Sequence, residues 1–435
     1  MTEVIFSFDT EDFTSNRAAD AICREAEILR EEGVRGGFCV VGLLAQQLKN
    51  WGRTDVIDAL KHHDILTHSY GHSLHPTINE YTDKENFDEA YKLFYEQEKQ
   101  AIEWIKDILG CDNVLGACPP GNQKSYVAMY GYSDMGLPIY ADTVCDTVNG
   151  RGVHYCNIYQ TKYTFTLEWF LKKSDDAFMR EKLDELAENE RVICFTHPNM
   201  AIFTDFWDAL NYWQENKCEF GQWKYATEHP AEKTEQYYES IRRFIRMMKA
   251  DKRFHITDYK TLYEKLTSAP KRVIYKSDIL KLKDILNNTP APIEKPSLSL
   301  SDLFLACKDF LNGADSHICG KVYGFLKAPY SVQSEIVLSK EDVIQSAKDM
   351  DTTRFLPEKI KVGESEIGPF DWLCAAMEIL SGAESATVIS KNQLPNLDHM
   401  PRLKDLDLTG WVQRKDFEDK YLSKRLQLQS WTMRY

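Results

Sequence analysis

Two histidines four positions apart and a short group of carboxylates are the residues of this chain whose types and spacing best suit a metal ion. The histidines are His68 and His72, and the carboxylates Asp9, Glu11 and Asp12 follow an apolar run near the N-terminus. Two imidazoles and one carboxylate give a divalent cation three protein ligands. The open fourth position can then take water or substrate, as in catalytic metal sites.

The elements that must position these side chains can be read from the pattern around them. Residues 4–8 are almost all apolar and stop at the carboxylates, which predicts a buried strand with acidic groups at its C-terminal end. From residue 17 to about 267, strand and helix patterns alternate, which predicts a parallel sheet with crossover helices. Helices are predicted over 17–32, 55–62, 91–109, 126–135, 175–188, 235–249 and 257–266, and strands over 37–41, 114–117, 138–141, 191–196 and 254–256.

Four motifs, in order along the chain, resemble those of the polysaccharide deacetylases, the NodB-homology family of carbohydrate esterases. They are Phe8-Asp9-Thr10-Glu11-Asp12, the run from His63 to His72, Cys118-Pro119-Pro120-Gly121, and Phe195-Thr196-His197-Pro198. The resemblance implies an α/β fold, an irregular (β/α)7 barrel of the NodB type. The helix-rich pattern after the barrel predicts a smaller, mainly helical C-terminal region.

The resemblance also implies a role for each motif residue. Asp9 corresponds to the general base, His68 and His72 to metal ligands, and His197 to the general acid. Much of the family has adjacent Asp-Asp where this chain has Asp-x-Glu-Asp. Family members with Asp-x-Asp or Asp-x-Glu favour Glu11 as the acidic ligand, and Asp12 is the alternative. The ligand set makes Zn²⁺ the first choice, and Co²⁺, Ni²⁺ or Fe²⁺ also suit it.

The implied reaction is hydrolysis of an N-acetyl group, or of a related amide, on a carbohydrate. A bound metal polarises the carbonyl and lowers the pKa of water from about 15.7 toward 7. Backbone N–H groups near Pro120 and Gly121 would help to hold the oxyanion, and His197 would protonate the leaving amine. Asp142, with Asp146 nearby, lies where the family has an acidic group that tunes this histidine. A second reading keeps the site and makes the substrate a ureide or another small cyclic amide.

One position departs from the family pattern. The third motif normally has Arg before its proline, where this chain has Cys118. Because that Arg usually holds the base, its loss affects Asp9. Either another basic group, such as Arg151, reaches Asp9, or the chain is a catalytically silent carbohydrate-binding barrel.

Aromatic residues crowd the stretch after His197. They are Phe203, Phe206, Trp207, Tyr212, Trp213, Phe220, Trp223 and Tyr225. At the mouth of a barrel such residues would form a wall that stacks on sugar rings, for which Trp207 and Trp213 are candidates, or the small core of an inserted hairpin. A lid over the site would do both.

The domain organisation is predicted from composition. Residues 1–268 form the barrel, and 269–297 read as a linker region, because they contain clustered prolines around a Lys-rich, helix-like run over 277–286. Residues 298–382 contain a weak repeat at an offset of 40, in which Ser299 and Ser339 each precede an acidic residue by three positions, a helix-start signal. The second copy of this repeat, through Leu373, resembles the pseudomurein-binding repeat, a module linked to cell-wall polymers. The alternative is a helical appendage that packs on the barrel or mediates dimerisation. The extension 383–435 has no readable function.

Composition limits the partners of this 435-residue chain. Its net charge of −14 argues against a nucleic-acid partner. No apolar run approaches the roughly 20 residues of a membrane span, and the first residues do not resemble an export signal. Eleven cysteines without a Cys-x-x-Cys pair favour reduced thiols. We therefore expect a cytoplasmic protein that acts on a carbohydrate or small amide, with a cell-wall polymer as a possible partner.

Overall fold

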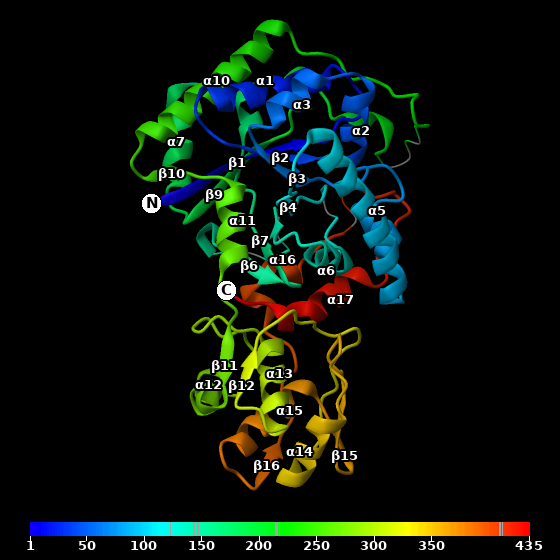
Figure 1. Cartoon of the computed structure of the whole chain (residues 1–435), viewed down its shortest axis with the longest axis vertical. Helices are drawn as coiled ribbons and strands as arrows, with labels where there is room; N and C mark the ends of the chain where they lie inside the picture. The colour runs from blue at the N-terminus through cyan, green and yellow to red at the C-terminus, as the bar shows by residue number, and fades with distance from the viewer. Residues whose placement is uncertain are drawn as a thin grey trace. The chain divides into compact units, whose positions relative to one another are not determined.

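The computed structural model describes residues 1–121, 123–141, 144–145, 148–213, 216, 218–408, 410 and 412–435. Contacts along the chain divide it into two compact units (Figure 1). The first unit contains Met1–Gly152, Ile158–Ser268 and Asp407–Leu422, and the second contains Val153–Asn157, Ala269–Leu406 and Ser423–Tyr435.

The first unit is built on a curled sheet whose described pairings are all parallel. Its strand order is β7-β5-β4-β3-β2-β1-β9-β8, and β10 also pairs with β1. The strands are β1 (Thr2–Thr10), β2 (Gly37–Val40), β3 (Asp64–Thr67), β4 (Gly116–Ala117), β5 (Ile139–Tyr140), β7 (Ile158–Gln160), β8 (Phe165–Thr166), β9 (Arg191–Thr196) and β10 (Phe254–Ile256). This sheet, with helices between successive strands, confirms the predicted α/β class and its barrel-like architecture.

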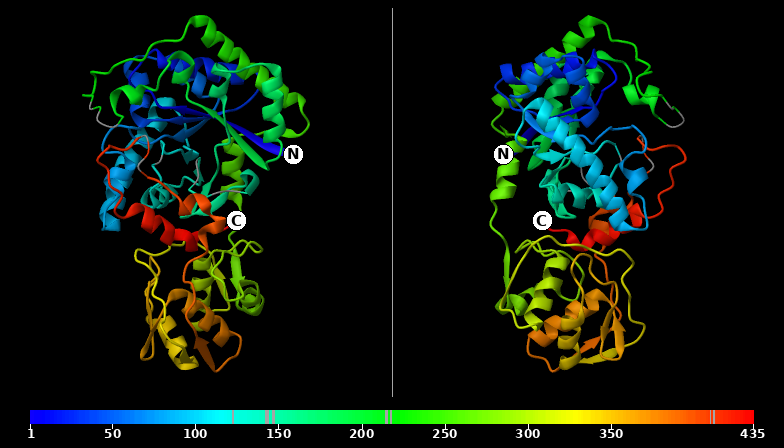
Figure 2. Two further views of the ribbon diagram at one scale, coloured as in Figure 1. Left: turned by 180° about the vertical axis from the view of Figure 1, so that it is seen from behind. Right: turned by 45° about the vertical axis from the view of Figure 1, so that its right-hand side comes forward.

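Helices cover the outside of this sheet (Figures 1 and 2). The helices of the first unit are α1 (Ala18–Glu31), α2 (Gly42–Asn50), α3 (Thr54–Leu60), α4 (Ile78–Thr82), α5 (Phe87–Leu109), α6 (Tyr126–Asp134), α7 (Asp176–Leu186), α8 (Asn199–Ile202), α9 (Trp207–Asn211), α10 (Ala231–Ala250) and α11 (Tyr259–Ser268). The predicted helices are all present. The largest boundary errors are at α5 and α10, which begin four residues before the predictions, α5 with the side chain of Asn86 capping its first turn.

Strand β1 lies at the centre of the first unit. One of its edges pairs with β9 over Glu3–Phe8, and the other pairs with β10 over Thr2–Val4 and with β2 over Ser7–Thr10. The apolar side chains of this strand are fully buried. Because the neighbouring strands are parallel, Asp9 lies at the same edge of the sheet as the residues that follow β3, β4 and β9.

The second unit contains two modules of the same topology. In each, a first strand and helix lead through a turn to a second helix and a last strand that pairs antiparallel with the first. The first module is β11 (Val273–Tyr275), α12 (Ile279–Leu286), α13 (Leu300–Leu311) and β12 (Ser316–Ile318). The second is β13 (Ile336–Ser339), α14 (Lys340–Asp349), the hairpin β14 (Ile360–Val362) and β15 (Ser365–Ile367), α15 (Pro369–Leu380) and β16 (Ser385–Val388). Strand β6 (Val153–Tyr155) also belongs to this unit.

The modules place the internal repeat differently from the sequence prediction. Ser299 and Ser339 do cap α13 and α14, as predicted. However, α13 is the second helix of its module and α14 is the first, so the offset of 40 joins elements that do not correspond. The capping signal is local and marks any helix start. The corresponding stretches are the helix ends at 311–316 and 380–385, which read Leu-Asn-Gly-Ala-Asp-Ser and Leu-Ser-Gly-Ala-Glu-Ser.

The stretch predicted as a linker region, 269–297, contains β11 and, within the run predicted to be helix-like, α12. Its apolar side chains Ile274, Ile279 and Leu282 are 2% exposed and belong to the core of the second unit. Clustered prolines and lysines suggested a linker, but the buried isoleucines and leucines of this stretch belong to a core.

The predicted C-terminal extension, 383–435, is divided between the units. It supplies β16, α16 (Pro401–Lys404) and α17 (Leu422–Leu428), and residues 407–422 belong to the first unit. We call residues 407–422 the strap. The backbone N–H of Arg414 donates to Glu80 Oε1 at 2.7 Å, and Val412 Cγ1 lies 3.2 Å from the point where a Cβ on Gly121 would be.

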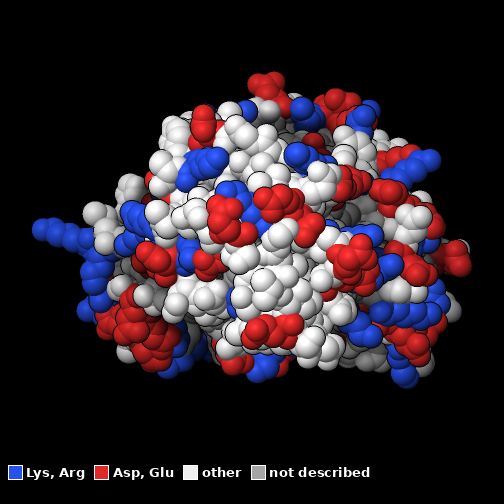
Figure 3. Space-filling view, turned by 90° about the horizontal axis from the view of Figure 1, so that it is seen from below, with Lys and Arg blue, Asp and Glu red and all other residues white. Residues whose placement is uncertain are grey.

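The surface carries both signs of charge. Acidic and basic side chains are interspersed on the face drawn in Figure 3. Among the described residues, no helix combines the length and the apolar character needed to cross a bilayer.

The strap depends on Asp83, whose carboxylate accepts the backbone N–H groups of Lys420, Tyr421 and Leu422 at 2.8–3.1 Å. Hydrogen bonds to a charged group stabilise by about 1.5–3 kcal/mol each. We therefore expect Asp83→Ala to raise the rate of tryptic cleavage at Arg414 and Lys420 by about tenfold or more. Asp112→Ala, at an exposed position, is the control. Unchanged cleavage in Asp83→Ala would show that the strap is held by other contacts.

Candidate metal centre

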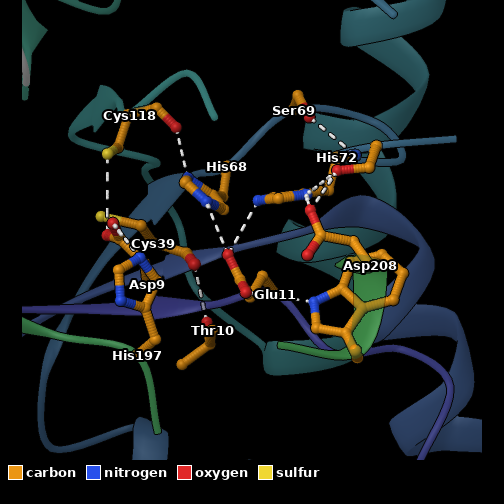
Figure 4. A network of polar contacts seen from close by, with 12 residues as sticks. Asp9, Thr10, Glu11, Cys39, His68, Ser69, His72, Cys118, His197 and Asp208 are labelled. Atoms are coloured by element: carbon orange, nitrogen blue, oxygen red, sulfur yellow. Dashed lines mark hydrogen bonds and ion pairs between the residues drawn. The ribbon is translucent and has the colours of Figure 1, made fainter. Parts of the chain in front are cut away.

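Three buried side chains of the first unit bring metal-ligating atoms together (Figure 4). Ligand atoms of Glu11, His68 and His72 all lie within 4.8 Å of one another. Glu11 Oε2 is 2.8 Å from His72 Nε2 and 3.8 Å from His68 Nε2. The strands and turns therefore place the predicted carboxylate and the predicted histidine pair around one point.

The tautomer of His68 is set by its backbone neighbour. Its Nδ1 is hydrogen bonded to the carbonyl oxygen of Cys118. Because a carbonyl only accepts, Nδ1 carries the proton and the lone pair of Nε2 faces Glu11. That Nε2 is buried and has no hydrogen-bond partner. A buried acceptor without a donor costs about 1–3 kcal/mol, and a metal ion at the cluster would satisfy it. The residues present thus fit a metal.

A tight turn, not a helix, returns His72 to the cluster. Ser69 and His72 have φ values of 70° and 51°, in the left-handed region that non-glycine residues rarely adopt. The backbone N–H of His72 donates to Ser69 Oγ at 3.0 Å, which holds the turn (Figure 4). The side-chain Nδ1 of His72 is 2.7 Å from Ser73 Oγ. Strained backbone of this kind persists where the surrounding structure enforces it, often at functional sites.

The two candidates for the acidic ligand lie in different environments. Asp12 Oδ1 accepts from the backbone N–H and hydroxyl of Thr14, at 2.9 and 2.6 Å, and from the N–H of Ser15 at 3.2 Å. Burial raises the pKa of Asp12 to about 7. Burial would also raise the pKa of Glu11, but the neighbouring His72 and His197 lower it well below its ordinary value. Glu11, and not Asp12, is therefore the carboxylate that faces the histidines.

Asp9 is held by neutral donors. Its Oδ1 accepts the hydroxyl of Tyr163 at 2.7 Å, and Cys118 Sγ lies 3.6 Å away. Tyr163 Oη also lies 2.9 Å from Cys118 Sγ and 3.1 Å from Ser7 Oγ. Burial raises the pKa of the Tyr163 phenol and of the Cys118 thiol well above their ordinary values, so both are protonated at neutral pH. Tyr163 thus holds Asp9, a role that the family pattern led us to expect of an arginine, and nothing in the sequence context of Tyr163 indicated it.

The suggestion that Arg151 reaches Asp9 is wrong. Arg151 lines a hollow together with Met1, Thr2 and Glu3, at the N-terminal end of β1. Asp9 is at the other end of that strand. Seven residues of strand separate Thr2 from Asp9 by roughly 23 Å, so the guanidinium cannot contact the carboxylate.

His197 follows β9 and is held by Glu168. Its Nδ1 is 2.6 Å from Glu168 Oε1, and its backbone N–H donates to the same oxygen at 3.2 Å. Its Nε2 faces Asp9 Oδ2 at 3.7 Å. Burial lowers the pKa of His197, but Glu168 and the nearby negative charges of Glu11 and Asp9 outweigh that effect and raise it to about 10. At neutral pH the imidazole therefore carries a proton on the nitrogen that faces Asp9.

Glu168 is a site residue that the sequence analysis missed. It follows β8, which pairs with β9, so the parallel topology brings it beside His197. Its position shortly after a strand was the available signal. Asp142, expected near this histidine, lies outside the described residues, as does Asp146.

The remaining predicted substrate residues lie in different surroundings. Trp207 is 3% exposed, and its indole N–H donates to Glu11 Oε1 at 3.1 Å. It therefore contacts the cluster and has no exposed ring face on which a sugar could stack. Trp213 is 39% exposed and can stack on a ligand. Pro120 and Gly121 lie in the loop after β4, where Gly121 has a φ of 50° and is covered by Val412. Their contacts with substrate stay predictions.

The pKa of His197 can be tested with Glu168→Gln, which keeps a hydrogen-bond acceptor but removes the charge. In the metal-free protein, ¹⁵N NMR should show the parent imidazole titrating near pH 10 and the variant at least one unit lower. An unchanged titration would contradict the role given to Glu168.

The same pair makes stability depend on pH. The pKa of His197 is about 10 in the folded protein and about 6.5 in an unfolded chain. Its stabilisation is therefore complete below pH of about 6.5 and is lost as the pH rises toward 10. The difference in unfolding free energy between the parent and Glu168→Gln should shrink over that interval, and Glu181→Gln, at an exposed glutamate, should show no such trend.

Comparison with known proteins finds similarity at the level of solved structures. No protein-family model and no curated protein sequence matches the chain. A protein from Mycobacterium smegmatis assigned as a polysaccharide deacetylase is 15% identical, with 61% of this chain and 90% of that chain covered and a TM-score of 0.40. A pseudoenzyme of carbohydrate esterase family 4 from Bacillus anthracis is 12% identical, with 60% of this chain and 65% of that chain covered and a TM-score of 0.36.

A family 4 carbohydrate esterase from Streptomyces lividans, solved with acetate, is 12% identical, with 60% of this chain and 95% of that chain covered and a TM-score of 0.33. The solved structures that this chain resembles thus include polysaccharide deacetylases of family 4, as the motifs led us to expect, at low identity. Assignment of a function to this chain depends on its own side chains.

Proposed function

We propose that this protein is a metal-dependent hydrolase that removes an N-acetyl group, or cleaves a related amide C–N bond, on a carbohydrate. The observation that carries the proposal is the unpartnered Nε2 of His68 beside Glu11 and His72, next to a carboxylate and a protonated imidazole that face each other. A ligand triad together with a separate base and acid is what amide hydrolysis requires.

Glu11, His68 and His72 would hold the metal. When bound there, a divalent cation supplies Lewis-acid polarisation of the substrate carbonyl and an acidified water. Zn²⁺ suits two imidazoles and one carboxylate, and Co²⁺, Ni²⁺ and Fe²⁺ are the alternatives. The hydrogen bond from His68 Nδ1 to Cys118 O places the ring proton on Nδ1 and leaves Nε2, the nitrogen that would bind the metal, unprotonated.

Asp9 would act as the base. Its Oδ1 is occupied by the Tyr163 hydroxyl, so Oδ2 is the oxygen that faces His197 and is free to accept a proton from water. Tyr163 orients the carboxylate with a single O–H and brings no positive charge to it. In this protein, therefore, the orientation of the base does not require the arginine of the family pattern.

His197 would protonate the leaving nitrogen. Glu168 fixes Nδ1–H, so the proton available for transfer is on Nε2. Amide nitrogen is a poor leaving group without a proton, and a positioned acid contributes about 10²- to 10⁴-fold to such a reaction. The raised pKa of His197 keeps this proton in place at neutral pH.

Substrate and location form part of the same proposal. We infer an N-acetylated carbohydrate or a small amide as substrate, and a cell-wall polymer held by the second unit as one form of it. Location in the cytoplasm is supported by the cysteines, which are all free thiols. A ureide or cyclic amide remains the second candidate because the same ligand and acid–base groups would hydrolyse it.

Metal content tests the ligand set. We expect about one equivalent of a transition metal in the purified protein and its loss in both His68→Ala and Glu11→Ala, since each variant removes one of three ligands. His75→Ala is the matched control, because His75 contacts Glu80 and the carbonyl of Tyr212 and no cluster residue. Elemental analysis that finds no metal in the parent, even after incubation with zinc or cobalt, would contradict the proposed metal-dependent hydrolase.

Turnover tests the acid–base assignment. Acetate release from free, nucleotide-linked and polymeric N-acetylhexosamines, beside ammonia or urea release from ureides, identifies the substrate class. Asp9→Asn should lower kcat by about 10²- to 10⁴-fold. Tyr163→Phe removes one hydrogen bond to a carboxylate, worth about 1.5–3 kcal/mol, and should lower kcat by roughly 10- to 100-fold.

Tyr330→Phe, in the second unit, is the control for these variants and should retain full turnover. If the metal-loaded parent binds carbohydrate but turns over none of these substrates, the catalytically silent barrel is the better description.

A further inference from the structure

The short helix α9 meets the metal cluster with two consecutive side chains. Trp207 donates its indole N–H to Glu11 Oε1 at 3.1 Å. Asp208 Oδ2 accepts the hydroxyl of Ser73 at 2.7 Å, and Ser73 Oγ is 2.7 Å from His72 Nδ1. Figure 4 shows Asp208 on the far side of His72 from Glu11. One turn of helix therefore supports two of the three proposed ligands.

Both side chains are fixed by burial and packing. Trp207 is 3% exposed and Asp208 is 1% exposed. The Trp207 ring lies 4.8 Å from the ring of Phe13 and 5.5 Å from that of His72, measured between centroids. A carboxylate is seldom this deeply buried unless hydrogen bonds or opposite charges compensate for its lost hydration. Here Asp208 is linked to His72 through the hydroxyl of Ser73.

The bond from Trp207 restricts how Glu11 can bind a cation. An indole N–H is a donor only, so it engages Oε1 without competing for metal. The other oxygen, Oε2, is the one that lies near His68 and His72. Trp207 therefore holds Glu11 in the orientation in which one oxygen, not two, is offered to the ion.

The chain through Ser73 fixes His72 in the same way. Because Ser73 donates its proton to Asp208, its oxygen is left to accept Nδ1–H from His72. With Nδ1–H held by Ser73, Nε2, which lies 2.8 Å from Glu11 Oε2, is the ring nitrogen left to bind an ion. Outer contacts of this kind set the orientation and basicity of a ligand, and their loss typically weakens metal binding by 10- to 100-fold.

We propose that Trp207 and Asp208 are positioning residues of the metal centre, and that docking of α9 and metal binding are coupled. This inference rests on the proposed metal site and assigns to the aromatic segment after His197 a role in assembling that site. Since linkage is reciprocal, the ion should stabilise the docked α9 by as much as the docked α9 strengthens binding of the ion.

The test compares Trp207→Phe and Asp208→Asn with two matched controls from the same segment, Trp213→Phe and Asp205→Asn, at exposed positions. The dissociation constant for Co²⁺ is measured by competition with a chelator. We expect both test variants to bind Co²⁺ about 10- to 100-fold more weakly than the parent and both controls to stay within about twofold.

Two further measurements separate positioning from a general loss of structure. The visible absorption of bound Co²⁺ reports its coordination, and it should change in Trp207→Phe as the second oxygen of Glu11 is released. Amide exchange of residues 207–213 should slow when Co²⁺ binds the parent and respond less in Asp208→Asn. Far-UV circular dichroism of all four variants should match the parent.

The outcomes distinguish the two proposals. A parent that binds no Co²⁺ overturns the metal centre and this inference with it. A parent that binds Co²⁺, with test variants that bind as tightly and give the same spectrum, overturns the coupling and leaves the metal centre intact.

Discussion

A buried negative charge, the carboxylate of Glu11, is the constraint on which the first unit depends. Desolvation of such a group is costly unless cations or hydrogen-bond donors surround it. Here it lies 3% exposed between two imidazoles from the loop after β3 and an indole from α9. Segments distant in sequence thus converge because each supplies part of what the carboxylate requires.

The proposed base and the proposed acid are each oriented by one hydrogen-bond partner, and the two partners differ in charge. Asp9 is held by a phenol, a donor without charge, whereas His197 is held by the carboxylate of Glu168. The first arrangement orients a proton acceptor without adding positive charge next to it. The second keeps a proton on an imidazole that burial alone would neutralise. The two groups face each other at 3.7 Å.

The sequence predicted the frame of the site better than its surroundings. Strand ends and the histidine pair are local patterns, so the positions of Asp9, Glu11, His68 and His197 could be derived from residues near each of them. The local pattern alone did not separate Glu11 from Asp12; the family resemblance favoured Glu11, and the turn in which Asp12 binds Thr14 gives the physical reason.

Partners contributed by distant segments had no local signal. Tyr163 contacts Asp9 and Glu168 contacts His197 only because β8 pairs with β9, and Trp207 was assigned to a sugar-stacking wall because its type, not its burial, was known. In the second unit, composition suggested a linker where buried isoleucines form a core. The prediction failed wherever tertiary pairing determined the role of a residue.

The strap has a consequence for the order in which the protein is made. Residues 407–422 belong to the first unit although nearly the whole second unit precedes them in the chain. At a synthesis rate of about 5–20 residues per second, roughly 8–30 s separate residue 268 from residue 422. During that time the loop at Gly121 and the carboxylates of Glu80 and Asp83 wait for their partners. The nascent barrel is therefore completed late, by a segment that the ribosome releases after residues 269–406 of the second unit and before its last part, Ser423–Tyr435.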